Sequence, residues 1–210
     1  MKFLEIARYG VALALTATMP SVLLFWMLIH PLAKLWRRFH PGVVYGVTLG
    51  VFIIGMAVIA SLRNRLLVTD WGTEPILIVL GAGFLGVSVW LRMLIGNAFT
   101  LSQLVGLPEL AVQGTYPQAG LVTTGIYAQM RHPRYTQLIV ASLGYAFFAN
   151  YPAAYIVVAA FIPGIYFVAL LEERELNERF GSAYADYARL VPRFIPTRLI
   201  FHDCKNSKTP

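Results

Sequence analysis

The stretch Arg131-His132-Pro133-Arg134-Tyr135 opens an apolar hairpin, and Glu172-Glu173 closes it. Two apolar runs, separated by Asn150-Tyr151-Pro152, lie between these charged clusters. If each run crosses a membrane, the chain passes through the bilayer and returns, so the two clusters lie side by side at one end of the hairpin. Ionisable groups at the ends of neighbouring spans usually mark a functional site.

The composition extends this interpretation to the whole chain. Of the 210 residues, 58% are hydrophobic and 13% are charged, whereas about a quarter are charged in soluble domains. The apolar runs are long and show no two-residue alternation, which favours helices over strands. We therefore expect an all-α integral membrane protein with about five transmembrane helices. The expected spans are about Tyr9 to Ile29, Gly42 to Leu62, Ile76 to Ile95, Tyr135 to Ala149 and Ala153 to Leu171.

The positive charges are divided unequally between the two ends of these spans. Lys2, Arg8, Arg63 and Arg65 lie on the side of the N-terminus, and the other thirteen Lys and Arg residues lie on the opposite side. The positive-inside rule assigns the larger set to the cytoplasm. We expect a multi-pass protein of the bacterial inner membrane, with its N-terminus outside and both signature clusters in the cytoplasm.

The charge and cysteine content exclude some functions. The net charge of +7 comes mainly from residues beside the spans, so contact with anionic membrane lipids explains it better than binding to nucleic acid. The single cysteine, Cys204, excludes an internal disulfide and a cysteine-based metal site. We expect no metal.

A helix is expected to run on beyond Glu172 and Glu173, because a carboxylate is disfavoured at a helix C-terminus. Adjacent helical positions diverge by about 100°, so only one of the two carboxylates is expected to face a given pocket. Apolar and aromatic side chains then recur at spacings of three and four, which predicts one amphipathic cytoplasmic helix against the apolar core. These residues are Leu176, Phe180, Ala183, Tyr187 and Leu190.

Several smaller features allow two interpretations each. Pro133 suits the first turn of a helix, so nearby backbone N–H groups could bind an anion beside Arg131 and His132; alternatively, these cations only set the topology. Gly125 either lets the backbone approach a ligand or forms an ordinary turn. Gly81-Ala82-Gly83, within the third span, indicates either tight helix packing or a ligand contact.

The order of these elements resembles the isoprenylcysteine carboxyl methyltransferase family and its phospholipid methyltransferase relatives. The resemblance covers the C-terminal part of the chain from about residue 120. It rests on Arg131-His132-Pro133, Glu172-Glu173, Leu176, Phe180-Gly181, Tyr184, Tyr187 and Val191-Pro192-Arg193-Phe194-Ile195-Pro196.

The resemblance implies methyl transfer from S-adenosylmethionine to a lipophilic or lipidated acceptor, with the carboxyl group of an isoprenylcysteine-like molecule as one candidate. It divides the chain into three N-terminal transmembrane helices (1–95), a cytoplasmic cofactor loop (96–134), a transmembrane hairpin (135–171) and a cytoplasmic C-terminal helix and tail (172–210). The implied catalytic residues are Arg131, Arg193 and Glu173. The implied cofactor-binding residues are Gly125, Tyr127, His132, Pro133, Tyr135, Glu172 and Glu173.

Two departures from the family pattern concern the acceptor and the cofactor. Eukaryotic members carry an arginine shortly before the acidic pair, whereas Val168 to Leu171 is apolar here, so Arg193 becomes the candidate partner of an acceptor carboxylate. Gln137 stands where many members have glycine, which would narrow the space beside the cofactor. Two alternatives remain open: an NADPH-dependent membrane reductase of the sterol reductase type, and a non-catalytic membrane subunit.

Overall fold

The computed structural model describes residues 2–29, 32–36, 38–96 and 120–196. These residues form helices and no strands. The helices are α1 (Lys2–Ile29), α2 (Ala33–Trp36), α3 (Pro41–Ser61), α4 (Arg63–Leu66), α5 (Pro75–Ile95), the 3-10 turn η1 (Gly125–Ala128), α8 (Pro133–Ala149), α9 (Pro152–Phe180) and α10 (Ser182–Leu190).

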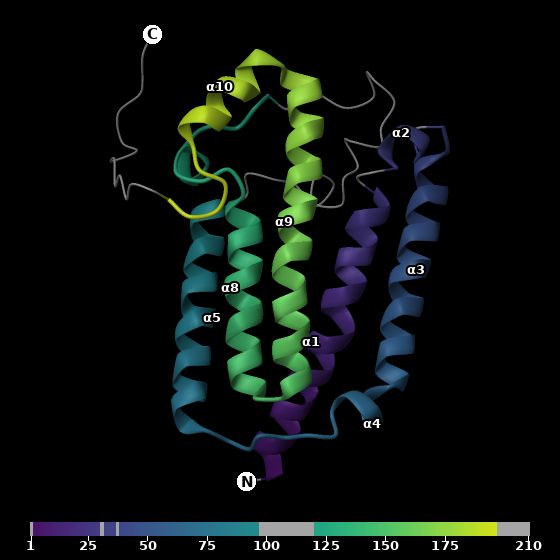
Figure 1. Cartoon of the computed structure of the whole chain (residues 1–210), viewed down its shortest axis with the longest axis vertical. Helices are drawn as coiled ribbons and strands as arrows, with labels where there is room; N and C mark the ends of the chain where they lie inside the picture. The colour runs from purple at the N-terminus through teal and green to yellow at the C-terminus, as the bar shows by residue number, and fades with distance from the viewer. Residues whose placement is uncertain (1, 30–31, 37, 97–119, 197–210) are drawn as a thin grey trace.

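Four of the described helices, α1, α3, α5 and α9, are long and apolar enough to cross a membrane. α8 has 17 residues, close to the shortest length that spans a bilayer, and it stands within the same bundle (Figure 1). The fold is therefore the expected all-helical membrane architecture, with α8 as the short fifth member. α8 contacts α5, α9 and α1, whereas α3 packs mainly against α1 at the outer side of the bundle.

The turn between α8 and α9 lies where the sequence predicts it. Asn150 ends α8 in the left-handed conformation, with φ of 55°, which asparagine tolerates better than most residues. Pro152 then occupies the first turn of α9, where its missing N–H removes no helical hydrogen bond. The resulting hairpin brings the start of α8 and the last turns of α9 to the same end of the molecule (Figure 1).

The Gly81-Ala82-Gly83 segment has two different environments. A Cβ on Gly81 would lie 2.8 Å from the carbonyl oxygen of Gly144, so α5 and α8 approach closely there, as the packing interpretation predicts. A Cβ on Gly83 would meet nothing within 4 Å among the described residues. Tight packing therefore explains Gly81 but not Gly83.

The C-terminal region corrects one prediction. α9 continues beyond Glu173 to Phe180, as expected, but the chain does not form one amphipathic helix through to Leu190. Gly181 has φ of 56° and separates α9 from α10. This break resets the helical phase, so spacings counted across it do not define one face. Tyr184 is consequently buried, at 4% exposed, while Leu190 is 84% exposed.

A cluster of polar side chains surrounds Arg8, at the end of the bundle that carries the turn between α8 and α9. Its side chain is 1% exposed and forms an ion pair with Asp70. It also donates to the carbonyl of Ala149 at 3.1 Å and to the hydroxyl of Thr73 at 3.0 Å. The sequence indicated Arg8 only as a topology charge, but the structure shows that it joins α1 to the end of α8 and to the segment before α5.

Candidate active site

The residues of the two sequence signatures meet at the end of the bundle that carries α10. The N–H of Arg131 donates to the carbonyl of Pro192 at 2.9 Å, and the N–H of His132 donates to that of Arg193 at 2.9 Å. The hydroxyl of Thr136 donates to the carbonyl of Phe194 at 3.0 Å. The segment that follows α10 is therefore fixed against the start of α8, which places Arg193 beside the other signature residues.

Glu173 is the centre of this arrangement. Its Oε1 lies 3.0 Å from Nε2 of His132 and 3.3 Å from Nη1 of Arg131. Arg193 binds the carboxylate through two nitrogens, with Nε at 2.8 Å from Oε1 and Nη2 at 2.7 Å from Oε2. Bidentate pairs of this kind are strong and directional. One carboxylate thus contacts two guanidinium groups and an imidazole, from two segments of the chain.

Glu172 approaches the same imidazole from its other nitrogen. Its Oε2 lies 3.5 Å from Nδ1 of His132, so the expectation that only one of the two carboxylates faces the site was too strict. Both side chains are long enough to reach a ring whose nitrogens point in different directions. The environments still differ, because the side chain of Glu173 is 12% exposed and that of Glu172 is 30% exposed.

The protonation of His132 follows from these neighbours. Burial alone would lower the pKa of His132, but the hydrogen bonds and negative charges of Glu172 and Glu173 outweigh it and raise the pKa above its ordinary value.

Glu173 lies beyond the apolar run of α9, which ends at Leu171. Burial would raise the pKa of Glu173, yet hydrogen bonds from Arg193 and His132, with the charge of Arg131, lower it to about 2.

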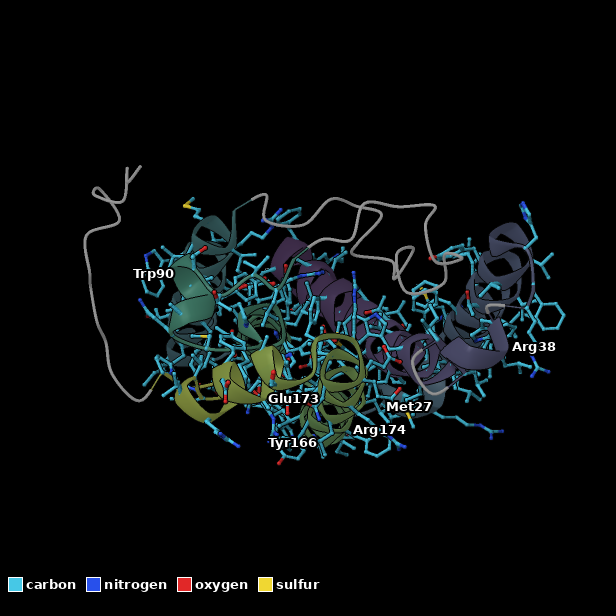
Figure 2. All side chains as sticks on the ribbon, turned by 90° about the horizontal axis from the view of Figure 1, so that it is seen from above. Met27, Arg38, Trp90, Tyr166, Glu173 and Arg174 are labelled. Atoms are coloured by element: carbon cyan, nitrogen blue, oxygen red, sulfur yellow. The ribbon has the colours of Figure 1, made fainter. Side chains whose placement is uncertain are left out.

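Aromatic side chains fix the orientation of the charged groups. Tyr135 stacks on the imidazole of His132, with ring centroids 5.4 Å apart and an interplanar angle of 16°, and Trp26 of α1 contacts Tyr135 edge-on at 5.5 Å. Tyr166 of α9 accepts a hydrogen bond from Nη1 of Arg193 at 3.0 Å. Tyr166 and Glu173 belong to α9, and Figure 2 shows both far from Arg38, which lies between α2 and α3.

The expected residues of the preceding loop lie next to this cluster. Gly125 begins η1 with φ of 62°, and a Cβ there would meet nothing within 4 Å. Positive φ, and not a close approach among described residues, is therefore its structural role. Tyr127 is buried, and its carbonyl accepts a hydrogen bond from the hydroxyl of Tyr187 at 2.6 Å. Burial raises the pKa of Tyr127 to about 12.

Two expected features concern the surroundings of the site. Pro133 is buried at the start of α8, as predicted for a first-turn proline. Gln137 points toward α5, where its amide donates to the hydroxyl of Ser88 at 2.8 Å, so it joins two helices. Residues 97–119, which make up most of the expected cofactor loop, lie outside the described residues, as does Cys204.

The part of the chain that the structure describes holds no group of three His, Cys, Asp or Glu side chains that could bind a metal ion. The site instead offers carboxylates, guanidinium groups, an imidazole and tyrosine hydroxyls. This set suits a ligand that carries both positive and negative charges.

Comparison with known proteins decides the family. The phospholipid methyltransferase profile matches residues 76–183, which run from α5 into α10. The chain belongs to the phospholipid methyltransferase family. The matched region contains Arg131, His132, Glu172 and Glu173, while Arg193 follows it.

Two curated relatives of this phospholipid methyltransferase family member come from Arabidopsis thaliana. Protein-S-isoprenylcysteine O-methyltransferase B is 34% identical over 77 residues, which is 36% of this chain and 39% of the relative. Protein-S-isoprenylcysteine O-methyltransferase A is 33% identical over 78 residues, which is 37% of this chain and 40% of the relative. The match thus spans about two-fifths of each relative. No solved structure matches the chain.

Sequence reasoning missed Tyr166, Trp26 and the burial of Tyr184. Tyr166 precedes Glu173 by seven residues, or about two helical turns, so a search for polar groups on the face of Glu173 would have found it. The contact between Trp26 and Tyr135 joins helices far apart in sequence, and nothing in the local pattern indicates it.

Proposed function

We propose that this protein is a membrane-embedded methyltransferase that uses S-adenosylmethionine and acts on a lipophilic acceptor. The observation that carries the proposal is the Glu173 cluster, in which Arg131, His132 and Arg193 converge on one carboxylate at the end of an apolar bundle. The family match supports methyl transfer over the alternatives of an NADPH-dependent reductase and a non-catalytic subunit. The printed names of the two relatives favour an O-methyltransferase.

The charges of the site fit the cofactor. S-adenosylmethionine carries a carboxylate, an ammonium group and a sulfonium, and the site offers both signs of charge within one cluster. Glu173 already contacts two guanidinium groups and an imidazole, so we assign it to positioning Arg131, His132 and Arg193. The more exposed Glu172 is the better candidate for the ammonium or the ribose hydroxyls of the cofactor.

The protonation of the site favours an acceptor that is already ionised. An amine would have to lose a proton before it attacked, and a general base works best with a pKa near the operating pH. Glu173, with a pKa of about 2, is too weak a base, and His132, with its raised pKa, tends to keep its proton. A carboxylate needs no base at neutral pH. When bound, the cofactor would supply an electrophilic methyl group on sulfur; its transfer to a carboxylate oxygen would give a methyl ester and release S-adenosylhomocysteine, with no proton to remove.

Arg193 remains our candidate for holding that carboxylate. A guanidinium has five N–H donors, and the described contacts of Arg193 to Glu173 and Tyr166 use three of its nitrogens once each. The remaining N–H groups can bind an acceptor from the side of Tyr166, which is 46% exposed on α9. This arrangement supports lateral entry of an amphiphilic molecule from the bilayer.

The reaction is tested by transfer of a labelled methyl group from S-adenosylmethionine to two lipid classes, an isoprenylcysteine carboxylate and phosphatidylethanolamine. We expect base-labile methyl esters on the carboxylate lipid and no labelled amine lipid. Arg193→Lys should lower carboxylate turnover at least tenfold while leaving cofactor affinity within about threefold, because a lysine ammonium can still pair with Glu173 but cannot offer the two remaining guanidinium N–H groups to an acceptor carboxylate. Methylation of the amine lipid alone would overturn the carboxylate assignment.

We also propose the orientation that the charge distribution indicates, with the N-terminus outside a bacterial inner membrane and the Glu173 cluster in the cytoplasm. Cysteine labelling tests this in intact cells that carry Cys204→Ser. An impermeant reagent should label Asn64→Cys, in exposed α4, and leave Ser182→Cys, at the start of α10, unlabelled until the membrane is opened. The reverse pattern would overturn the orientation.

A further inference from the structure

Two buried polar atoms at the site form no hydrogen bond of good geometry among the described residues. They are the hydroxyl of Tyr184 and Nε of Arg131. Tyr184 is 4% exposed, so water does not cover its hydroxyl from outside. Nearly all buried polar groups in folded proteins have a partner, and the exceptions often lie where a ligand or an ordered water binds.

Both atoms are donors, and they lie in the same electrostatic environment. Burial, followed by the negative charge of Glu173, raises the pKa of Tyr184 to about 12, so its hydroxyl keeps its proton at neutral pH. The guanidinium of Arg131 is always charged, and its Nη1 already contacts Glu173 at 3.3 Å. The charge of Arg131 and a weak side-chain hydrogen bond from it oppose this rise, so the two groups lie side by side. A neutral donor beside a cationic donor is complementary to a carboxylate oxygen.

We propose that Nε of Arg131 and the hydroxyl of Tyr184 bind the carboxylate of the methionine part of the cofactor. The inference rests on the proposed function and assigns Tyr184 as a binding residue. It places the carboxylate next to α10 and not on the backbone N–H groups at the start of α8. Glu172, whose negative charge also reaches Tyr184, then lies where it can receive the neighbouring ammonium group.

Tyr187 provides a matched control within the same short helix. Its hydroxyl donates to the carbonyl of Tyr127 at 2.6 Å, and its ring lies 6.0 Å from that of Tyr184. Burial raises the pKa of Tyr187 to about 12 as well. Tyr187→Phe therefore removes a hydroxyl whose proton already has a protein acceptor, whereas Tyr184→Phe removes one whose proton has no acceptor among the described residues.

The experiment measures binding of two ligands to the full chain in detergent, by calorimetry. One ligand is S-adenosylhomocysteine, and the other is its decarboxylated analogue. We expect Tyr184→Phe to weaken S-adenosylhomocysteine binding about tenfold, in line with a hydrogen bond to a charged group, and to leave the analogue within about twofold of wild type. Without ligand, Tyr184→Phe should melt no lower than wild type, and Tyr187→Phe should melt lower.

Each other result contradicts the inference. Equal weakening with both ligands means that the hydroxyl binds another part of the cofactor, and no weakening means that it binds none. A clearly lower melting temperature of ligand-free Tyr184→Phe means that the hydroxyl has a structural partner. If the wild type binds neither ligand, the proposed function is wrong and the inference fails with it; the other three results leave the proposed function standing.

Discussion

The two ends of the bundle each contain a charged cluster, but the clusters are built in opposite ways. At one end a single cation, Arg8, is surrounded by Asp70, Thr73 and the carbonyl of Ala149. At the other end a single carboxylate, Glu173, is surrounded by two guanidinium groups and an imidazole from two segments. Each cluster joins parts of the chain that are far apart in sequence.

The difference lies in what each cluster leaves unsatisfied. Nε, Nη1 and Nη2 of Arg8 all have protein partners, and the side chain is 1% exposed. The Glu173 cluster includes Nε of Arg131 and the nearby hydroxyl of Tyr184, which form no hydrogen bond of good geometry among the described residues, and it borders the partly exposed Glu172. We infer that the Arg8 cluster contributes to stability, whereas the Glu173 cluster contributes to ligand binding.

Arg8→Ala should have the largest effect on folding. It leaves the Asp70 carboxylate and the Ala149 carbonyl without their donor, and removing one member of a buried pair costs about 3–5 kcal/mol. We expect about 3 kcal/mol, because the side chain of Asp70 is 38% exposed. Thermal unfolding in detergent measures this loss, and the folded fraction should bind S-adenosylhomocysteine as the wild type does. An undiminished melting temperature would remove the distinction between the two ends.

Glu173→Gln should have the converse effect. The amide cannot hold Arg131, His132 and Arg193 in place, and displacing groups of a binding site by about 1 Å can cost about a hundredfold. We expect S-adenosylhomocysteine affinity to fall about a hundredfold in calorimetric titration, with a smaller loss of melting temperature than in Arg8→Ala. Glu178→Gln is the control, since Glu178 lies on the same helix but is 52% exposed. Wild-type affinity in Glu173→Gln would exclude the cluster from the binding site.

Helix α5 packs along α8 within the bundle. Two glycines of α5, Gly81 and Gly83, predict different results when each is replaced by alanine. Gly81→Ala would place a Cβ 2.8 Å from the carbonyl oxygen of Gly144, and such overpacking costs about 1–3 kcal/mol. Gly83→Ala meets nothing within 4 Å and should stabilise the helix by up to about 1 kcal/mol. Melting temperatures measure both. If Gly83→Ala weakened cofactor binding and Gly81→Ala did not, the interpretation of this motif as a ligand contact would be supported.

The smallest expected effect is a difference in the pH dependence of the two ends. The raised pKa of His132 gives stability that is present below pH 6.5 and is lost as the pH rises through its folded-state pKa. Burial would raise the pKa of Asp70, but hydrogen bonds from Gly72 and Arg8 lower it, so its contribution is lost as the pH falls below about 4. In melting curves from pH 3 to 9, His132→Gln should flatten the decline in melting temperature on the alkaline side, and Asp70→Asn should flatten the decline on the acid side. Unchanged curves in both variants would contradict these assignments.

The sequence predicts the fold well because hydropathy, prolines and helix-ending residues act locally. The spans, the turn at Asn150, the proline at the start of α8 and the extension of α9 beyond Glu173 follow from such local signals. The break at Gly181 was missed, since a repeat of three and four residues can be counted through a glycine whose φ only the folded chain reveals.

The site is predicted less completely because its geometry depends on distant contacts. The motifs identify His132 and the acidic pair. They do not show that both carboxylates reach one imidazole or that Arg193 binds Glu173. The Arg8 cluster could not be predicted from the sequence for the same reason, since Arg8 and Asp70 are 62 positions apart. The expected roles of Arg131, Tyr135 and Glu172 toward a ligand remain predictions.

The most direct test of the account is the melting temperature of the wild-type protein in detergent with S-adenosylhomocysteine, with NADPH and with neither. A ligand that binds only the native state at a hundred times its dissociation constant adds about 2.7 kcal/mol of stability. The account predicts a rise in melting temperature with S-adenosylhomocysteine and none with NADPH. A rise with NADPH alone would favour a reductase, and no rise with either ligand would contradict the claim that the Glu173 cluster is a cofactor site.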